Sequence, residues 1–82
     1  MSYYLYILYS KTKDRFYIGQ TSDPDERLNY NNAGYVMSTK SGRPWERIFL
    51  KEFLNRSDAM KEESRLKKAK NRTYLEWYMA KG

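Results

Sequence analysis

The run YYLYILY at residues 3–9 decides the fold of this chain. It is a continuous apolar and aromatic segment of strand length, which is typical of a strand buried on both faces and therefore central in a sheet. Residues 11–14 are polar and turn-like, and the following segment RFYIG, residues 15–19, resumes strand character. The short separation predicts an antiparallel hairpin, with Gly19 ending its second strand where the backbone or a ligand approaches closely.

A strong helix start follows the predicted hairpin. Asp23 can cap a helix, Pro24 suits its first position, and Glu26 can complete a capping box. We expect this helix to run to about Asn32 and to stop at Gly34.

The sequence pattern of the second half of the chain predicts one strand and two helices. Residues 31–44 are polar with little periodicity, which indicates a long loop of the kind that often binds ligands. Residues 45–54 predict a third strand, and a helix opening at Ser57 and Asp58 ends near Asn71. A last helix from about Thr73 would close the core with Leu75, Trp77, Tyr78 and Met79.

The predicted fold class is therefore α+β, a small three-stranded antiparallel sheet flanked by helices in the order β-β-α-β-α-α. With 82 residues, the chain is expected to form a single domain over residues 1–82. A composition of 40% hydrophobic and 32% charged residues excludes both a disordered tail and a membrane protein.

Two absent residue types limit the metal sites and the general bases that this chain can form. Cysteine is absent, which excludes disulfides and thiolate metal sites, and the missing histidine removes the commonest general base. No apolar run approaches the roughly 20 residues that span a bilayer, and no signal-peptide pattern opens the chain. We therefore expect a cytoplasmic protein with no membrane partner. Its formal charge of +6 would attract polyanions, of which nucleic acid is the most abundant; the alternative is a basic surface that serves solubility.

Two tyrosines and an arginine are predicted to converge. Tyr6 and Tyr17 would sit on neighbouring strands, and Arg27 lies one turn into the helix that follows. Such a convergence of polar side chains indicates a site.

A carboxylate interrupts the apolar face of the second helix. Glu63 lies between Ala59 and Leu66 on that face, while Glu62 points more to the side. Since an unpaired buried charge is costly, Glu63 should meet a metal ion, an arginine or a lysine. The alternative is a glutamate at the edge of the apolar face that pairs with Lys67 at i+4, and spacing alone favours it.

These segments, taken in order, resemble a known family. Tyr4-Leu5-Tyr6, then Tyr17-Ile18-Gly19, then Arg27 and a glutamate in the helix after the third strand are similar to the GIY-YIG nuclease domain. The small stand-alone members, similar to the N-terminal module of the bacterial excision-repair nuclease C subunit, are the nearest in pattern. The resemblance covers nearly the whole chain, with further matches at residues 32–34, 39–40 and 44–45.

The resemblance implies the α+β fold and a metal-dependent endonuclease that hydrolyses DNA phosphodiester bonds, in DNA repair or recombination. In the implied catalytic set, Tyr17 helps to activate the attacking water, Tyr6 positions it and Arg27 stabilises the phosphate. Glu63 would hold a single divalent cation, Mg²⁺ or Mn²⁺. This chemistry is reasonable, because an arginine and a hard cation offset the negative charge of the transition state.

Further residues are predicted to contact nucleic acid, and the substrate to be branched or damaged DNA with specificity supplied by a protein partner. Those residues are Gln20, Asn31, Lys40, Lys67 and Lys70.

Asn31 is the main departure from the family pattern, because many members have histidine or tyrosine there. Its amide can donate to a phosphate but cannot take a proton. A catalytically weak or inactive GIY-YIG-fold module that binds DNA or a protein partner is therefore the alternative hypothesis. A basic domain with no nucleic-acid role is a third, and it predicts no salt-dependent DNA affinity.

Overall fold

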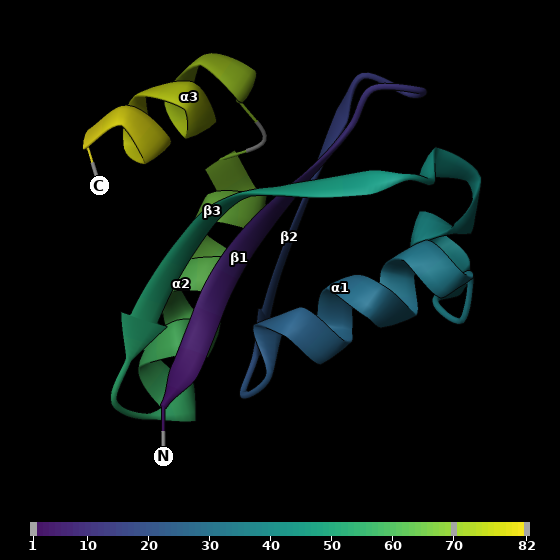
Figure 1. Cartoon of the computed structure of the whole chain (residues 1–82). Coiled ribbons are helices and arrows are strands. Elements are labelled where there is room, and N and C mark those ends of the chain that lie inside the picture. The colour runs from purple at the N-terminus through teal and green to yellow at the C-terminus, as the bar shows by residue number, and fades with distance from the viewer. Residues whose placement is uncertain (1, 70, 82) are drawn as a thin grey trace.

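The computed structural model describes residues 2–69 and 71–81 and contains three strands, three α-helices and one 3₁₀ helix (Figure 1). The predicted order β-β-α-β-α-α is confirmed, with the 3₁₀ helix η1 as an addition between α1 and β3. The elements are β1 (Tyr3–Ser10), β2 (Arg15–Thr21), α1 (Pro24–Ala33), η1 (Met37–Gly42), β3 (Trp45–Phe53), α2 (Arg56–Ala69) and α3 (Arg72–Lys81).

The first strand is the centre of the sheet. The strand order is β2-β1-β3, and both neighbours pair with β1 in the antiparallel sense. Residues 5–8 are all buried, as the continuous apolar run predicted. Tyr6 faces Gly19 across β2 and Leu50 across β3, so the middle of β1 is paired on both edges.

Alternate side chains of β1 enter two different cores. Leu5 and Ile7 pack with Leu66 of α2 and with Leu75 and Tyr78 of α3. Tyr6 and Leu8 pack on the other face with Trp45, Tyr17 and Leu28, the last of which belongs to α1. Figure 1 shows the same division, with α1 well apart from α2 and α3. Helices on both faces bury both sides of the central strand.

The ends of α1 match the local sequence signals. The Asp23 carboxylate accepts a hydrogen bond from the Glu26 amide at 3.1 Å, and Gly34 ends the helix with φ 88°. That left-handed conformation suits glycine because it has no Cβ. Within the described residues, no helix is both long enough and apolar enough to cross a membrane.

Three boundary or burial predictions were wrong. Gly19 does not end β2, which continues to Thr21 because Gln20 and Thr21 pair with residues 5 and 4 of β1. β3 ends at Phe53, and Leu54 is 86% exposed in the turn that follows. Trp77 does not close the core: its side chain faces solvent and is 53% exposed, whereas α3 buries Leu75 and Tyr78.

The polar segment 31–44 is a fixed part of the fold rather than an open loop. The Asn32 amide donates to the Trp45 carbonyl at 3.0 Å and its oxygen accepts from the Trp45 amide at 2.6 Å. The Trp45 indole donates to the Thr39 carbonyl at 2.6 Å, and the Ser10 hydroxyl to the Gly42 carbonyl at 2.6 Å. These hydrogen bonds tie η1 to α1, β1 and β3.

Replacing Leu66 with alanine tests the core between the sheet and α2. Leu66 is fully buried, so Leu66→Ala should lower the free energy of unfolding by about 2–5 kcal/mol, through lost burial and a cavity. Leu54→Ala is the matched control and should cost less than about 0.5 kcal/mol, since Leu54 is exposed. Urea unfolding followed by circular dichroism measures both. Equal losses in the two variants would contradict the packing described.

Candidate active site

Tyr6 and Tyr17 lie beside each other on the face of the sheet that α1 covers. Their ring centroids are 6.5 Å apart, and the Tyr17 ring is 6.1 Å from the ring of Trp45. Tyr6 is only 4% exposed, and Tyr17 is half-buried. The predicted neighbourhood of the two tyrosines is therefore present.

Gly19 provides the space that the Tyr6 ring occupies. The two residues are directly opposite in the β1–β2 ladder. A Cβ atom at Gly19 would lie 2.5 Å from Cζ of Tyr6, far inside the van der Waals contact distance. The close approach predicted at Gly19 is thus made by the side chain of Tyr6.

The pKa of Tyr6 is shifted by its burial and by four neighbouring residues. Burial, with smaller contributions from the nearby Tyr17 and Glu63, raises the pKa of Tyr6 to about 12, and Arg27 and the Asn31 amide partly offset the rise. Tyr6 therefore keeps its proton at neutral pH and is a hydrogen-bond donor rather than a base. The same influences place Arg27 and Glu63 within electrostatic range of the Tyr6 hydroxyl.

Glu63 forms an ion pair with a residue of its own helix. Its Oε2 atom lies 2.8 Å from Nζ of Lys67, and the Glu63 side chain is 21% exposed. The Lys67 ammonium in turn lies 5.9 Å from the centroid of the Tyr17 ring. The pairing at i+4, one of the two predicted alternatives, is therefore present, and the pair lies beside Tyr17.

Glu63 does not belong to a larger cluster of metal-ligating residues in the part of the chain that the structure describes. In residues 2–69 and 71–81, no group of three or more aspartates, glutamates, histidines or cysteines is arranged to hold a metal ion. Among the described residues, Lys67 is the ion-pair partner of the Glu63 carboxylate. A metal ion at this cluster would therefore have Glu63 as its protein ligand and would need water or substrate oxygens for the rest.

Arg27 stands in the first turns of α1, where its amide donates to the Asp23 carbonyl at 3.1 Å. Its guanidinium forms no ion pair with any described residue. A hollow of about 170 Å³ opens beside it, lined by Thr21, Ser22, Asp23, Glu26, Arg27 and Tyr30. The position leaves the guanidinium able to bind an anion.

Asn31 requires a correction, because it does not point outward to meet a phosphate. It is fully buried: its amide donates to the Arg27 carbonyl at 2.9 Å and its oxygen accepts from the Thr39 hydroxyl at 2.6 Å. Both ends of the side chain are therefore occupied inside the protein. Asn31 links α1 and η1 beneath Tyr6 and Arg27, which is a supporting position.

Gln20, Lys40 and Lys70 are the other predicted nucleic-acid contacts. Gln20 faces Leu5, on the side of the sheet that α2 covers, and its Oε1 is buried without a hydrogen-bond partner among the described residues. Lys40 is exposed on η1. Neither one makes a hydrogen bond or ion pair with Tyr6, Tyr17, Arg27 or Glu63. Lys70 lies outside the described residues.

The helical spacing placed Glu62 at the side of α2, but two side chains hold its carboxylate. It is about as buried as Glu63, and it accepts hydrogen bonds from Arg65 at 2.9 Å and from the Tyr78 hydroxyl at 2.7 Å. The Arg65 guanidinium lowers the pKa of Glu62. The i,i+3 spacing of Glu62 and Arg65 is the sequence signal that could have predicted this pair.

Comparisons with known proteins bear on the fold and the family of the chain. The family model described as the GIY-YIG catalytic domain matches residues 2–76. The UPF0213 protein OB0043 of Oceanobacillus iheyensis is 36% identical over 66 residues, which cover 79% of this chain and 76% of that protein. The solution NMR structure of the UPF0213 protein BH0048 from Bacillus halodurans is similar with a TM-score of 0.61 and 28% identity, covering 98% of this chain and 84% of that one. Neither name states an activity.

A double-mutant cycle tests the contact between Gly19 and Tyr6. Gly19→Ala should lower the free energy of unfolding by about 1–3 kcal/mol, because the new methyl group displaces the Tyr6 ring. In a Tyr6→Ala background, the same glycine substitution should cost much less, since the ring is gone. Urea unfolding of the four proteins gives the coupling. Additive effects would show that the two residues do not constrain each other.

Proposed function

Because the chain belongs to the GIY-YIG family, whose members are generally endonucleases, we propose that it is a metal-dependent endonuclease that hydrolyses DNA phosphodiester bonds. The observation that carries this proposal is the cluster of Tyr6, Tyr17 and Glu63, within electrostatic range of an arginine that has no partner in the described structure. We propose that the protein acts in DNA repair or recombination, on branched or damaged DNA, and that a protein partner supplies its specificity.

Arg27 is the proposed phosphate ligand. Hydrolysis builds negative charge on the non-bridging oxygens of the phosphate, and a guanidinium can stabilise that charge with two parallel hydrogen bonds. Arg27 forms no ion pair with a described carboxylate, which supports this role.

The two tyrosines are proposed to act on the attacking water in different ways. Tyr6 is buried and keeps its proton, so its hydroxyl can donate a hydrogen bond that orients a reacting oxygen. Tyr17 is more accessible and lies beside it, so we assign to Tyr17 the part of helping to activate the water. The different burial of the two rings supports this division.

The residues present fit one divalent cation. Glu63 offers a hard oxygen ligand through its carboxylate, which also pairs with Lys67. Mg²⁺ prefers oxygen ligands and commonly binds through one or two carboxylates together with water and substrate phosphates, so a single glutamate suffices. When bound, Mg²⁺ or Mn²⁺ would supply Lewis-acid stabilisation of the phosphate charge.

A GIY-YIG-fold module that binds DNA or a protein partner without cutting is the second candidate. Two observations favour it: Asn31 is locked in the interior, and the charge of Glu63 is already balanced by Lys67. This candidate predicts salt-sensitive DNA binding that needs no metal ion and leaves the DNA intact.

Replacing Glu63 with glutamine separates the two candidates. Glu63→Gln keeps the shape of the side chain but removes its charge, so DNA cleavage with Mg²⁺ or Mn²⁺ should fall at least about 100-fold. Folding and DNA binding should be retained. Gel assays on labelled single-stranded, nicked, branched and duplex DNAs measure the cleavage.

Glu46→Gln is the matched control, since Glu46 is an exposed glutamate of β3 and its loss changes the net charge equally. It should cut like the unmodified protein. Cutting that survives Glu63→Gln would disprove the assigned role of Glu63. DNA binding without cutting by any of the three proteins would favour the binding module.

A further inference from the structure

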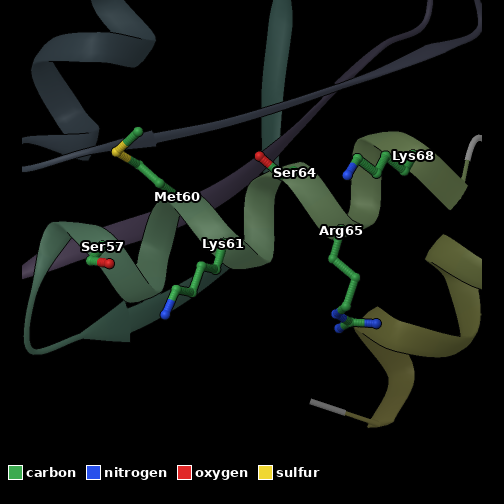
Figure 2. A pocket seen from close by; sticks show the side chains of 6 residues that line it. All are labelled: Ser57, Met60, Lys61, Ser64, Arg65 and Lys68. Atoms are coloured by element: carbon green, nitrogen blue, oxygen red, sulfur yellow. The ribbon is translucent and has the colours of Figure 1, made fainter.

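The outer side of α2 carries a row of cations that the candidate active site does not use. Lys61, Arg65 and Lys68 follow the spacing of one helix face, opposite to Glu63, and Figure 2 shows the Arg65 guanidinium directed toward α3. Lys61 and Lys68 form no ion pair with any described residue. A groove of about 700 Å³ lies along this row, lined by Ser57, Met60, Lys61, Ser64, Arg65 and Lys68.

Arg65 also borders a second hollow, of about 430 Å³, which lies between β3, α2 and α3. Its lining combines three aromatic and three cationic side chains with one carboxylate: Lys51, Glu62, Arg65, Tyr74, Trp77, Tyr78 and Lys81. The Tyr74 and Trp77 rings are 5.7 Å apart, and Nζ of Lys81 lies 4.9 Å from the Trp77 centroid. Arg65 therefore lines both the groove and the hollow.

Core packing does not account for Trp77. The neighbouring Leu75 and Tyr78 supply the buried contacts of α3, whereas more than half of the Trp77 side chain is exposed. Glu62 is the acidic residue in the two linings, and Arg65 and Tyr78 already hold its oxygens. The surface thus combines an accessible indole ring with lysines that form no ion pair with the lining carboxylate.

We propose that this surface binds single-stranded nucleic acid. We call it the α2–α3 surface and define it by Lys51, Lys61, Arg65, Lys68, Trp77 and Lys81. Proteins bind unpaired strands by combining two features. A row of cations contacts the phosphate backbone, and an exposed aromatic ring stacks with a base. The phosphates lie along α2, and one base stacks on Trp77. An intact duplex lacks a free base face, so an unpaired strand binds more tightly.

The α2–α3 surface and the candidate active site lie on opposite sides of one helix. Lys67, paired with Glu63, lies near Tyr17, whereas Lys61, Arg65 and Lys68 fall on the opposite face of α2 by their helical spacing. The diameter of a helix with its side chains is about 10–12 Å, so a nucleic acid that bends around α2 touches both. The binding itself goes beyond the proposed cleavage and does not depend on it.

Tryptophan fluorescence in the absence of metal ions tests the proposal. An oligodeoxythymidylate of about 12 nucleotides is titrated into the full chain. The two tryptophans are Trp45, which is 7% exposed, and Trp77, so quenching reports on Trp77. We expect quenching, and an affinity that falls as salt is raised. Trp77→Leu should weaken binding about 5–100-fold when followed by fluorescence anisotropy of a labelled oligonucleotide.

Matched variants separate stacking from charge. Trp77→Phe keeps an aromatic ring and should retain most of the affinity. The double variant Lys61→Ala, Lys68→Ala should bind more weakly and with a shallower salt dependence. Lys11→Ala removes an exposed lysine in the turn between β1 and β2 and should have little effect. Circular dichroism confirms that each variant is folded.

Three outcomes would overturn the proposal: unchanged oligonucleotide binding in Trp77→Leu, duplex DNA that competes as well as the single strand, or poly-glutamate that quenches Trp77 as strongly. The last result would reassign the surface to an acidic protein partner. Because the titration contains no metal and no cleavage readout, a failure of the nuclease proposal leaves its outcome unaffected.

Discussion

The contact between the Tyr6 ring and the backbone of Gly19 is the constraint on which the candidate site depends. It lets a central, buried strand carry a phenol close to a neighbouring strand. A buried hydroxyl needs polar neighbours, and Asn31 reaches it from α1. Asn31 is held by Thr39, whose carbonyl accepts from the Trp45 indole. One polar network thus joins the hairpin, α1, η1 and the start of β3.

The helix α2 is the second organising element, because its side chains contact three different parts of the protein. Leu66 enters the core, and Glu63 with Lys67 reaches the tyrosines. Arg65 turns outward and binds Glu62, which the Tyr78 hydroxyl of α3 also contacts. A small domain can bury only a limited area, so several functions must share one helix. This sharing explains why neighbouring glutamates, Glu62 and Glu63, have different partners.

Local signals in the sequence were enough for the sheet, the helix cap and the family. The run at residues 3–9 predicts a central strand by itself, and Asp23 caps α1 through contacts three residues away. Features decided by distant contacts were not predictable. The burial of Asn31 depends on where η1 places Thr39, and the exposure of Trp77 depends on which face of α3 packs on the sheet. The roles of Tyr6, Tyr17, Arg27 and Glu63 rest on family resemblance and remain predictions.

The central claim is that this cluster cleaves a phosphodiester bond with Arg27 on the phosphate. The most direct measurement compares the unmodified protein with Arg27→Ala on a labelled DNA that joins a duplex to an unpaired strand, with Mg²⁺ and with a chelator. The account predicts nicking that requires Mg²⁺ and falls at least about 100-fold in Arg27→Ala. Nicking that persists in the variant or in the chelator, or a DNA left intact by the unmodified protein, would contradict it.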